Sequence, residues 1–429
     1  MTAATATDVL DAPTTARPKV GLKTPVVYAL AALAALALLL PGVGAEESTT
    51  FQFSSGSEWF SIPNLTVPAL LTLVVLTVVM AAAAAWAFVL VRQRRRAPAW
   101  LHAAVGLAFV LAFLTYAGAG KTSVIPMVSL LAGALALSVP LVFGALSGVI
   151  CERSGIINIA IEGQLLFGAF AAAVTASALG SGYWGLLAAP VAGALVGALL
   201  AWFAVSYQVN QIIVGVVLNT LILGLTGFLF ATVLADNKAL WNTRMPLPRI
   251  RIPVLSEIPV LGPVLFNQTV LIYLMYVIVV VLNIMLFRSR WGLRTRAVGE
   301  HPKAADTVGI KVNVRRVWNT ILGGAVAGLG GAFFTVGSGL AFGREMSAGN
   351  GFIALAAMIL GKWNPYGAVA AALLFGFSKN LGNVLSTIGS GVPSELLLML
   401  PYLITIFAVA GFVGRVRPPA AEGIPYTKS

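Results

Sequence analysis

Two glutamates interrupt a densely apolar part of the chain, and they are the side chains best placed to act on a polar solute. Glu152 and Glu162 fall in the run ERSGIINIAIEGQ, residues 152–164. Ionisable groups in apolar surroundings are costly and are usually retained for function. Asn158 and Gln164 add hydrogen-bonding amides to the same run. The segment therefore predicts polar groups that select or pass a solute.

The same run contains two glycines, Gly155 and Gly163, that would permit a helix break. Broken helices near the middle of the membrane build the binding sites of many transporters. A structural alternative is open: Arg153 could pair with the glutamate before it, and Asn158 could cap the next helix. Capping leaves the second glutamate and Gln164 unexplained, so we favour the solute pathway.

A second group of amides lies at the start of a later apolar segment and within it. Asn210 and Gln211 precede it and Asn219 lies within it. Buried amides often only join helices, so a pathway role and a structural role both stay open here. Lys379, in another apolar segment, is a similar case: it could line the pathway, or it could extend to the surface. The predicted substrate-pathway residues are Asn158, Glu162, Gln164, Asn210, Gln211 and Asn219.

The sequence favours no catalytic chemistry. The run YAGAGKTS from Tyr116 to Ser123 resembles a phosphate-binding loop, but Thr115 stands where that pattern needs glycine, and no buried strand precedes it. The single cysteine, Cys151, excludes an internal disulfide, and the two histidines are too far apart in the sequence to indicate a metal site. We therefore expect no catalytic residue, no metal and no nucleotide site.

The composition is that of a polytopic membrane protein. Of 429 residues, 59% are hydrophobic and 10% are charged, and the mean hydropathy is +0.94. The net charge of +13 comes from basic residues clustered in short loops. That pattern marks the cytoplasmic side of a membrane and argues against nucleic acid as a partner. We expect an all-α integral membrane protein with about 10–12 transmembrane or re-entrant helices.

Composition also divides the chain. We expect a disordered cytoplasmic tail at 1–24, an extra N-terminal transmembrane region at 25–123, a core at 124–417 and a C-terminal tail at 418–429. The proline-rich loop 235–267 should lie outside. Residues 352–360 span only half a bilayer and predict a broken or re-entrant segment. Full spans are expected at 25–40, 69–91, 101–118, 124–149, 162–179, 184–206, 212–234, 269–287, 317–341, 368–377 and 395–413.

The most polar segment between two apolar runs is 288–316, with eight basic and two acidic residues. Pro302 suits the first position of a helix and Gly309 suits the position after its end. The short helix between them would pack through Ala304, Ala305 and Val308. We interpret it as a docking element for a soluble partner. A loop that only fixes membrane orientation is the alternative.

These runs carry a resemblance. Residues from about 135 to 417 resemble the permease subunits of bacterial ABC importers for branched-chain amino acids, simple sugars and nucleosides, and look most similar to the nucleoside type. The ERSG-x-x-NI-x-x-EG run is fairly specific for the nucleoside group, whereas the loop motif is shared across the branch. The stretches that carry the resemblance are VPLVFGALSGVICERSGIINIAIEGQLLFGAF, NQIIVGVVLNTLILGLTG, GLRTRAVGEHPKAADTVGIKVNVRR and ALAAMILGKWNPYGAVAAALLFG.

The resemblance implies a coupling helix at Glu300–Gly309, seated in a cleft of an ATPase subunit, and a translocation path beside Asn158–Gln164. It also implies three kinds of partner: the ATPase, a second permease subunit in a homo- or heterodimer, and an extracytoplasmic substrate-binding lipoprotein. ATP would be bound by the ATPase, with no cofactor in this chain. The implied ATPase-coupling residues are Arg294, Gly299, Glu300, Pro302, Ala304, Ala305 and Gly309.

We therefore expect a non-enzymatic, multi-pass permease subunit, surrounded by lipid in a bacterial cytoplasmic membrane and translocating nucleosides. The same machinery for simple sugars or branched-chain amino acids is the alternative. From another class, an ion-coupled secondary transporter could act through Glu162. The first ~120 residues depart from the shorter family members and add about three spans of ~20 residues each.

Overall fold

The computed structural model describes residues 21–56, 58–389, 399 and 417–427. Contacts divide the chain into two units, one made of residues 1–49 and 66–123 and the other of residues 50–65 and 124–429. Within the described ranges, ten helices are long and apolar enough to cross a membrane. This confirms the all-α membrane class. Most of the expected tail 1–24, and the expected span 395–413 apart from Met399, lie outside the described residues.

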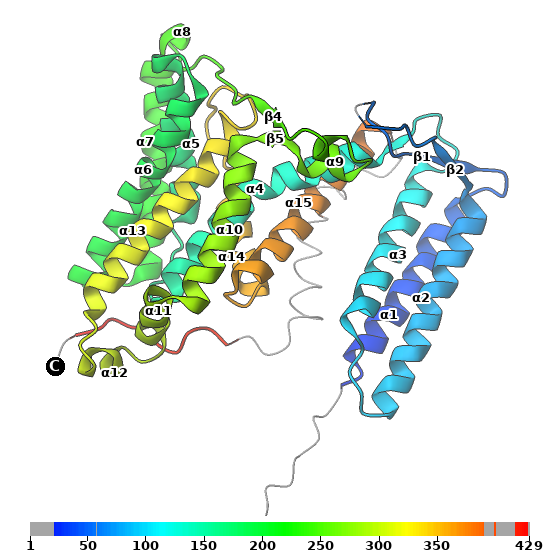
Figure 1. The fold of residues 1–429 in the computed structure, drawn as a ribbon, viewed down its shortest axis with the longest axis horizontal. Helices are drawn as coiled ribbons and strands as arrows, with labels where there is room; N and C mark the ends of the chain where they lie inside the picture. Colours follow the sequence, from blue (N-terminus) through cyan, green and yellow to red (C-terminus); the bar gives the residue numbers. More distant parts are fainter. Residues whose placement is uncertain (1–20, 57, 390–398, 400–416, 428–429) are drawn as a thin grey trace, which may run out of the picture. The chain divides into compact units, whose positions relative to one another are not determined.

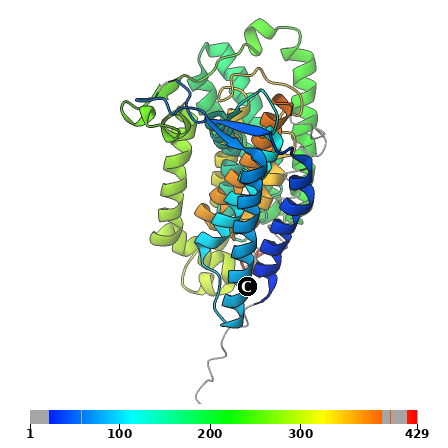
Figure 2. The same cartoon turned by 90° about the vertical axis from the view of Figure 1, so that its right-hand side faces the viewer.

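The first unit is a three-helix assembly. Its helices are α1 (Lys23–Ala34, continued by π and 3₁₀ turns to Gly42), α2 (Ala69–Arg92) and α3 (Ala99–Gly118). Figures 1 and 2 both show the three side by side. Tyr28 of α1 is 1% exposed, and its hydroxyl shares a 2.5 Å hydrogen bond with Nδ1 of His102 on α3. A buried hydroxyl needs such a partner in an apolar bundle.

The second unit is a larger bundle built around α4. Helix α4 (Met127–Glu152) is buried over almost its whole length, and α13 (Val312–Gly331) packs against it. From Ser138 to Glu152 every residue of α4 is buried, so the apolar residues of this part need no helical periodicity. The other long helices are α5 (Ile161–Leu179), α6 (Gly182–Ala201), α7 (Gln211–Leu229), α10 (Val270–Arg288) and α15 (Pro365–Thr387).

Short elements cap the two ends of this bundle. In Figure 1, α8 (Lys238–Trp241) and the antiparallel pair β4 (Arg249–Arg251) and β5 (Asn267–Thr269) lie at one end. Helices α11 (Arg290–Glu300) and α12 (Pro302–Thr307) lie at the other. The loop 235–267 and the basic loop are thus at opposite ends, as the expected crossings require. The remaining short elements are β1 (Ser48–Gln52), β2 (Leu65–Pro68), β3 (Ile125–Pro126) and α9 (Leu261–Leu265).

Two expectations needed correction in length, and the first is the span expected at 317–341, whose helix ends at Phe334. The half-span is confirmed as α14 (Asn350–Leu360), but the following helix α15 extends ten residues beyond the expected end at 377. That end contains Ser378, Lys379 and Asn380, and such polar residues suggested a helix end. In the fold their side chains turn inward or bond to backbone carbonyls, so the helix continues.

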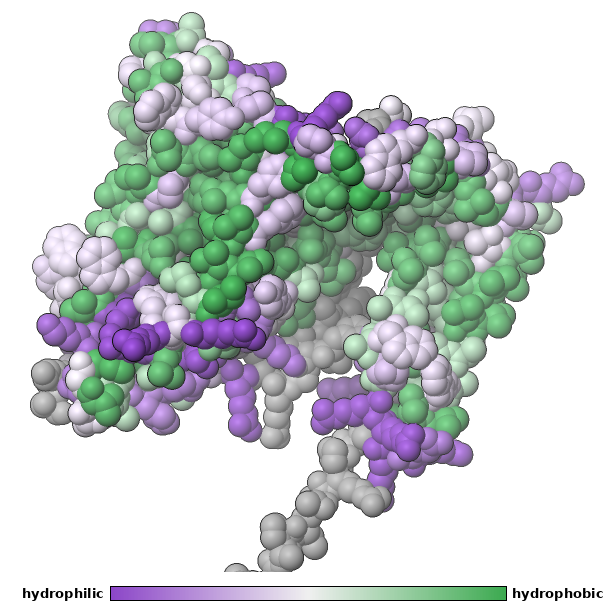
Figure 3. Space-filling view, viewed as in Figure 1, coloured by the Kyte–Doolittle hydropathy of each residue, from purple (hydrophilic) through white to green (hydrophobic). Residues whose placement is uncertain are grey.

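The surface agrees with a membrane setting. Figure 3 shows hydrophobic residues over the middle of the bundle and hydrophilic residues gathered around α11 and α12. On α10, Val277, Val280 and Ile284 are 46–56% exposed. Apolar side chains left open at helical spacing fit a lipid-facing surface, because lipid rather than water surrounds them.

Helices α6 and α13 approach each other through glycines. A Cβ added to Gly193 would lie 2.6 Å from the Cα of Gly328, and one added to Gly197 would lie 2.6 Å from the Thr320 carbonyl oxygen. Small residues four apart let membrane helices pack backbone to backbone, where van der Waals contact replaces the hydrophobic effect. This contact sets the spacing of the helices around α4.

We predict that Gly193→Ala destabilises the protein by about 1–3 kcal/mol, because the methyl group must push α6 and α13 apart. Thermal unfolding in detergent measures the loss. Gly224→Ala on α7 is the control, because its added Cβ has no neighbour within 4 Å. A helical glycine without neighbours gains propensity when replaced by alanine. Equal melting temperatures for the two variants would contradict the packing argument.

Candidate functional site

The connection between α4 and α5 turns at Gly155. Its φ of +90° lies in the left-handed region, and an added Cβ would sit 2.7 Å from Nη2 of Arg316. The expected helix break is confirmed here, because α4 ends at Glu152 and α5 begins at Ile161. Gly163 lies inside α5 and breaks nothing; its missing side chain makes room for Asn219.

Asn158 and Gln164 bond to each other rather than to an open cavity. Nδ2 of Asn158 donates to Oγ of Ser147 and to Oε1 of Gln164, both at 3.0 Å, and Nε2 of Gln164 donates back to Asn158 at 3.2 Å. All three side chains are 0% exposed. The capping alternative for Asn158 is wrong, since Ala160 holds the cap position of α5 without a side-chain bond. These amides position α5 against α4.

Glu162 has a different environment. Its two carboxylate oxygens accept the backbone N–H groups of Gly349, at 2.8 Å, and Gly351, at 2.6 Å. These amides begin the half-helix α14, whose first N–H groups have no partner within the helix. A negative charge there is also favoured by the helix dipole. The residue that looked most like a solute ligand therefore also fixes the start of a helix that ends within the bundle.

A lysine that sequence reasoning set aside lies beside this carboxylate. Nζ of Lys379 on α15 donates to Oδ1 of Asn350 at 3.3 Å, within electrostatic reach of Glu162. The surface alternative for Lys379 is wrong, because its hydrogen-bond partner lies at the start of α14. A lysine inside an apolar segment and next to Asn380 was the available signal.

The amides around α7 tie that helix to the α4–α5 connection. Oδ1 of Asn219 accepts the Gly163 N–H at 2.8 Å, and its Nδ2 donates to the Ile159 carbonyl at 2.9 Å. Oε1 of Gln211 accepts the Ile157 N–H at 2.7 Å. Gln211 is 2% exposed, so it fits the structural alternative, in which a buried amide joins helices. Asn210 caps α7 by accepting the N–H groups of Ile212 and Ile213.

A cavity of about 400 Å³ opens between α5, α7 and the segment before α14. Glu162 and Asn219 line it on one side, and Glu345 and Ser347 on the other. Phe352 adds an aromatic face that is 51% exposed. Carboxylates and amides at the mouth of an otherwise apolar cavity suit an uncharged solute with several hydrogen-bonding groups.

The basic loop folds into two helices, at the end of the bundle opposite α8. Pro302 starts α12, and Gly309 follows it with a φ of +83°, both as expected. Glu300 does not belong to the short helix: it ends α11, and His301 separates the two. The missed helix α11 buries Gly292, Thr295 and Gly299 along one face. Polar and small residues at that spacing gave no hydrophobic signal.

The packing face of α12 is narrower than expected. Ala305 is 3% exposed and contacts Val298 and Val312, whereas Val308 is 74% exposed and Ala304 is also exposed. The predicted apolar face is therefore wrong for Ala304 and Val308, because α12 rests on α11 and α13 through one residue. The exposed pair faces outward, where it is available to a partner.

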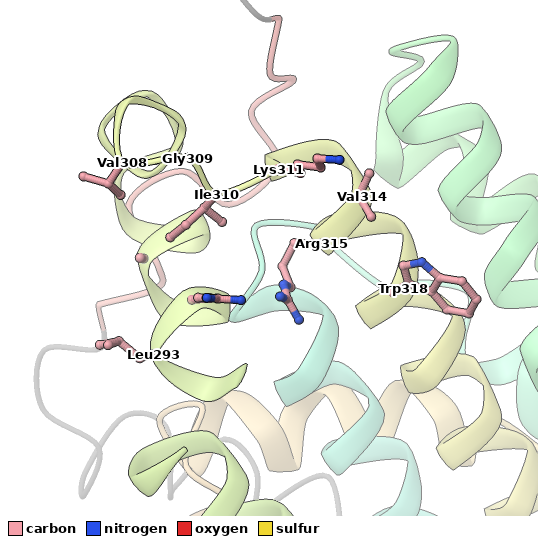
Figure 4. A pocket seen from close by; sticks show the side chains of 10 residues that line it. Leu293, Val308, Gly309, Ile310, Lys311, Val314, Arg315 and Trp318 are labelled. Carbon is pink, nitrogen blue, oxygen red and sulfur yellow. The ribbon is translucent and has the colours of Figure 1, made fainter. Parts of the chain in front are cut away.

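A cavity of about 570 Å³ lies beside α12 (Figure 4). Arg294, Lys311 and Arg315 line it, and none of them forms an ion pair within the part of the chain that the structure describes. Val308 and Trp318 mark its two sides in Figure 4. Unpaired cations around an apolar hollow suit an acidic surface on a partner.

Comparison with known proteins identifies the class. Residues 130–409 match the model of the family described as branched-chain amino acid transport system / permease component, and the chain belongs to that family. It is a multi-pass permease of a bacterial cytoplasmic membrane, and its relatives are transporter subunits rather than enzymes. No solved structure is significantly similar to it.

The names of individual relatives are more specific about the solute than the description of the family. The chain is 40% identical to the guanosine ABC transporter permease protein NupQ of Bacillus subtilis, over 68% of this chain and 95% of that one. It is 38% identical to the nucleoside ABC transporter permease protein NupC of Lactococcus lactis, over 70% and 97%. It is also 33% identical to the putative glucose ABC transporter permease protein TsgC13 of Haloferax volcanii, over 55% and 71%.

We predict that Asn158→Ala destabilises the protein by about 1–3 kcal/mol, because it leaves the buried amide of Gln164 without an acceptor. Thermal unfolding in detergent measures the change. Thr232→Val is the control, since this exposed hydroxyl bonds only to a carbonyl of its own helix. A melting temperature for Asn158→Ala equal to that of the control would show that the amide pair does not position α5.

Proposed function

We propose that this chain forms one half of the translocation pore of an ABC importer and that its solutes are nucleosides. The observation that carries the proposal is the cavity lined by Glu162, Asn219, Glu345 and the exposed Phe352. A nucleoside offers ribose hydroxyls that donate to carboxylates, base edges that pair with an amide, and a flat base that stacks on an aromatic ring. The names of the two relatives near 40% identity support this choice.

The carboxylate of Glu162 has capacity for both of its proposed roles. Each oxygen accepts one backbone N–H from the start of α14. A carboxylate has about four lone-pair sites, so a ribose hydroxyl can donate to a remaining one. Any solute bound there would be linked directly to α14, because the same side chain holds both.

One wall of the cavity is missing from the single chain. Thr220 on α7 and Phe352 on α14 are both exposed, and α7 leaves Val216, Val217 and Leu221 at 50–58% exposed. A pathway for a polar solute cannot be open to lipid on that side. We propose that the second permease subunit closes it, and that an extracytoplasmic binding lipoprotein delivers the solute to the assembled pair.

The energy source would be a separate ATPase subunit that docks on α12. Exposed Ala304 and Val308, together with the cationic hollow formed by Arg294, Lys311 and Arg315, provide a compact surface for it. ATP would be bound and hydrolysed on that subunit, and its movement would reach this chain through α12. The family match favours this machinery over an ion-coupled transporter acting through Glu162.

Substrate class is tested by uptake of labelled guanosine, adenosine and uridine in cells that lack the gene, with and without a plasmid copy. Restored uptake that excess nucleoside inhibits, but ribose, glucose and leucine do not, is the expected result. Inhibition by glucose instead would favour the sugar alternative, which the Haloferax relative represents.

We predict that Phe352→Ala raises the KM for nucleosides, because base stacking on an aromatic side chain contributes about 1–3 kcal/mol. Phe352→Tyr should retain most of the affinity. Phe228→Ala is the matched control, because this exposed phenylalanine on α7 does not line the same cavity. An unchanged KM in Phe352→Ala, with normal membrane levels, would exclude the cavity as the nucleoside site.

We predict that Ala304→Glu reduces both ATPase co-purification and uptake by about tenfold or more, since an unmatched charge in an interface costs several kcal/mol. Membrane levels should stay normal, because Ala304 is exposed. Ala239→Glu, on exposed α8 at the opposite end, makes the same change away from the docking surface. Normal co-purification of Ala304→Glu would remove the docking assignment from α12.

A further inference from the structure

The C-terminal segment 417–427 lies along the same end of the bundle as α11 and α12 (Figure 1). The backbone N–H of Ala421 donates to the Gly299 carbonyl at 2.9 Å, and that of Gly423 donates to the Gly155 carbonyl at 3.1 Å. The Ala420 N–H donates to Oε2 of Glu300 at 3.2 Å. The segment thus joins the end of α11 to the α4–α5 turn.

Arg316 holds this segment from the other side. Its side chain is 2% exposed, and its guanidinium donates to three backbone carbonyls: Ser154 at 3.2 Å, Ile424 at 2.8 Å and Ala421 at 3.4 Å. No carboxylate pairs with it in the described part of the chain. A buried cation needs every such bond, and two of the three come from the tail.

The tail also occupies the space beside the glycine of the ERSG run. A Cβ on Gly155 would meet Nη2 of Arg316 at 2.7 Å and the Ala421 carbonyl oxygen at 3.1 Å. The turn is therefore shaped to receive both groups. Without the tail, the Ala421 carbonyl oxygen would not restrict this position.

At its far end the segment reaches under α12. Tyr426 is 9% exposed and packs with Val298, Ala305 and Val312. Its hydroxyl interacts with the carboxylate of Asp306 on α12. Ala305 is the one buried residue of α12, so Tyr426 of the tail forms part of the surface against which that helix packs.

In its middle the segment reaches the pore helices. The carboxyl group of Glu422 lies within electrostatic reach of Glu152, the last residue of α4, and its Oε2 is buried without a hydrogen-bond partner in the described part of the chain. Burial raises the pKa of Glu422. Glu152 in turn accepts the indole N–H of Trp363 at 2.5 Å, in the turn between α14 and α15.

We propose that residues 417–427 form a strap that transmits movement of α12 to the Glu152–Trp363 end of α4, α14 and α15, with Arg316 and Tyr426 as its positioning residues. This inference rests on the proposed ATPase docking at α12. Tyr426 moves with α12, Arg316 keeps the strap against the α4–α5 turn, and Glu422 carries the displacement to Trp363. The turn it reaches is strained, because Lys362 and Trp363 both have a positive φ.

The first test compares the Tyr426→Ala variant, which keeps both tail carbonyls that accept from Arg316, with wild type in the complete importer. We expect normal membrane levels and ATPase co-purification, but about tenfold less nucleoside taken up per ATP hydrolysed, within the range of coupling between linked sites. Ile424→Ala is the control: its side chain is 55% exposed and its carbonyl still accepts from Arg316. An unchanged ratio, or a loss of uptake that only follows a loss of protein, would overturn the strap.

The second test needs no transported solute, so it separates the strap from the substrate assignment. In a Cys151→Ser background, Tyr426→Cys is labelled with a membrane-impermeant maleimide in inside-out vesicles, with and without an ATP analogue that traps the ATPase. We expect the labelling rate to change about tenfold on trapping, while Ile424→Cys labels rapidly in both states. Equal rates for Tyr426→Cys with and without the analogue would show that the tail does not move with α12.

Discussion

The rest of the bundle depends on how Glu162 satisfies the start of α14. A helix that begins within an apolar bundle leaves N–H groups that neither water nor lipid can bond. Glu162 accepts two of them and so fixes α14 to α5. Gly351 must be small for this approach, because its added Cβ would lie 2.5 Å from the Cα of Glu162. The polar cavity lies where the start of this half-helix meets α5 and α7.

Much of this architecture can be predicted from the sequence, because it depends on residues that are close together in the chain. Apolar runs of spanning length predict helices, and the short run before Gly361 predicted the half-span. Pro302 and Gly309 correctly bracketed α12, because both residues act through their own backbone. The expected break at Gly155 was also correct, although the guanidinium of Arg316, which leaves no room for a side chain there, lies 161 residues away in sequence.

The failures share a different cause. The sequence left Lys379 between the pathway and the surface, and Val308 was expected to be buried, because each prediction used only the residue and its own helix. Their environments are set by Asn350 and by the α11–α13 packing, which no periodicity encodes. Arg316 read as one more cation in a basic loop. Its burial depends on carbonyl groups of a C-terminal segment beyond the family match, which ends at residue 409.

These contacts give the two ends of α14 opposite characters. At its start, charged Glu162 holds two amides with short hydrogen bonds and shares its surroundings with Lys379. At its end, Arg153 donates to the carbonyls of Lys362 and Trp363, whose left-handed conformations cost energy. A helix fixed firmly at one end and held in strain at the other can pivot, since relief of the strain offsets part of the cost of movement. The cavity lies at the fixed end and the cytoplasmic contacts lie at the strained end, so a pivot would change access to the solute without dismantling its binding groups.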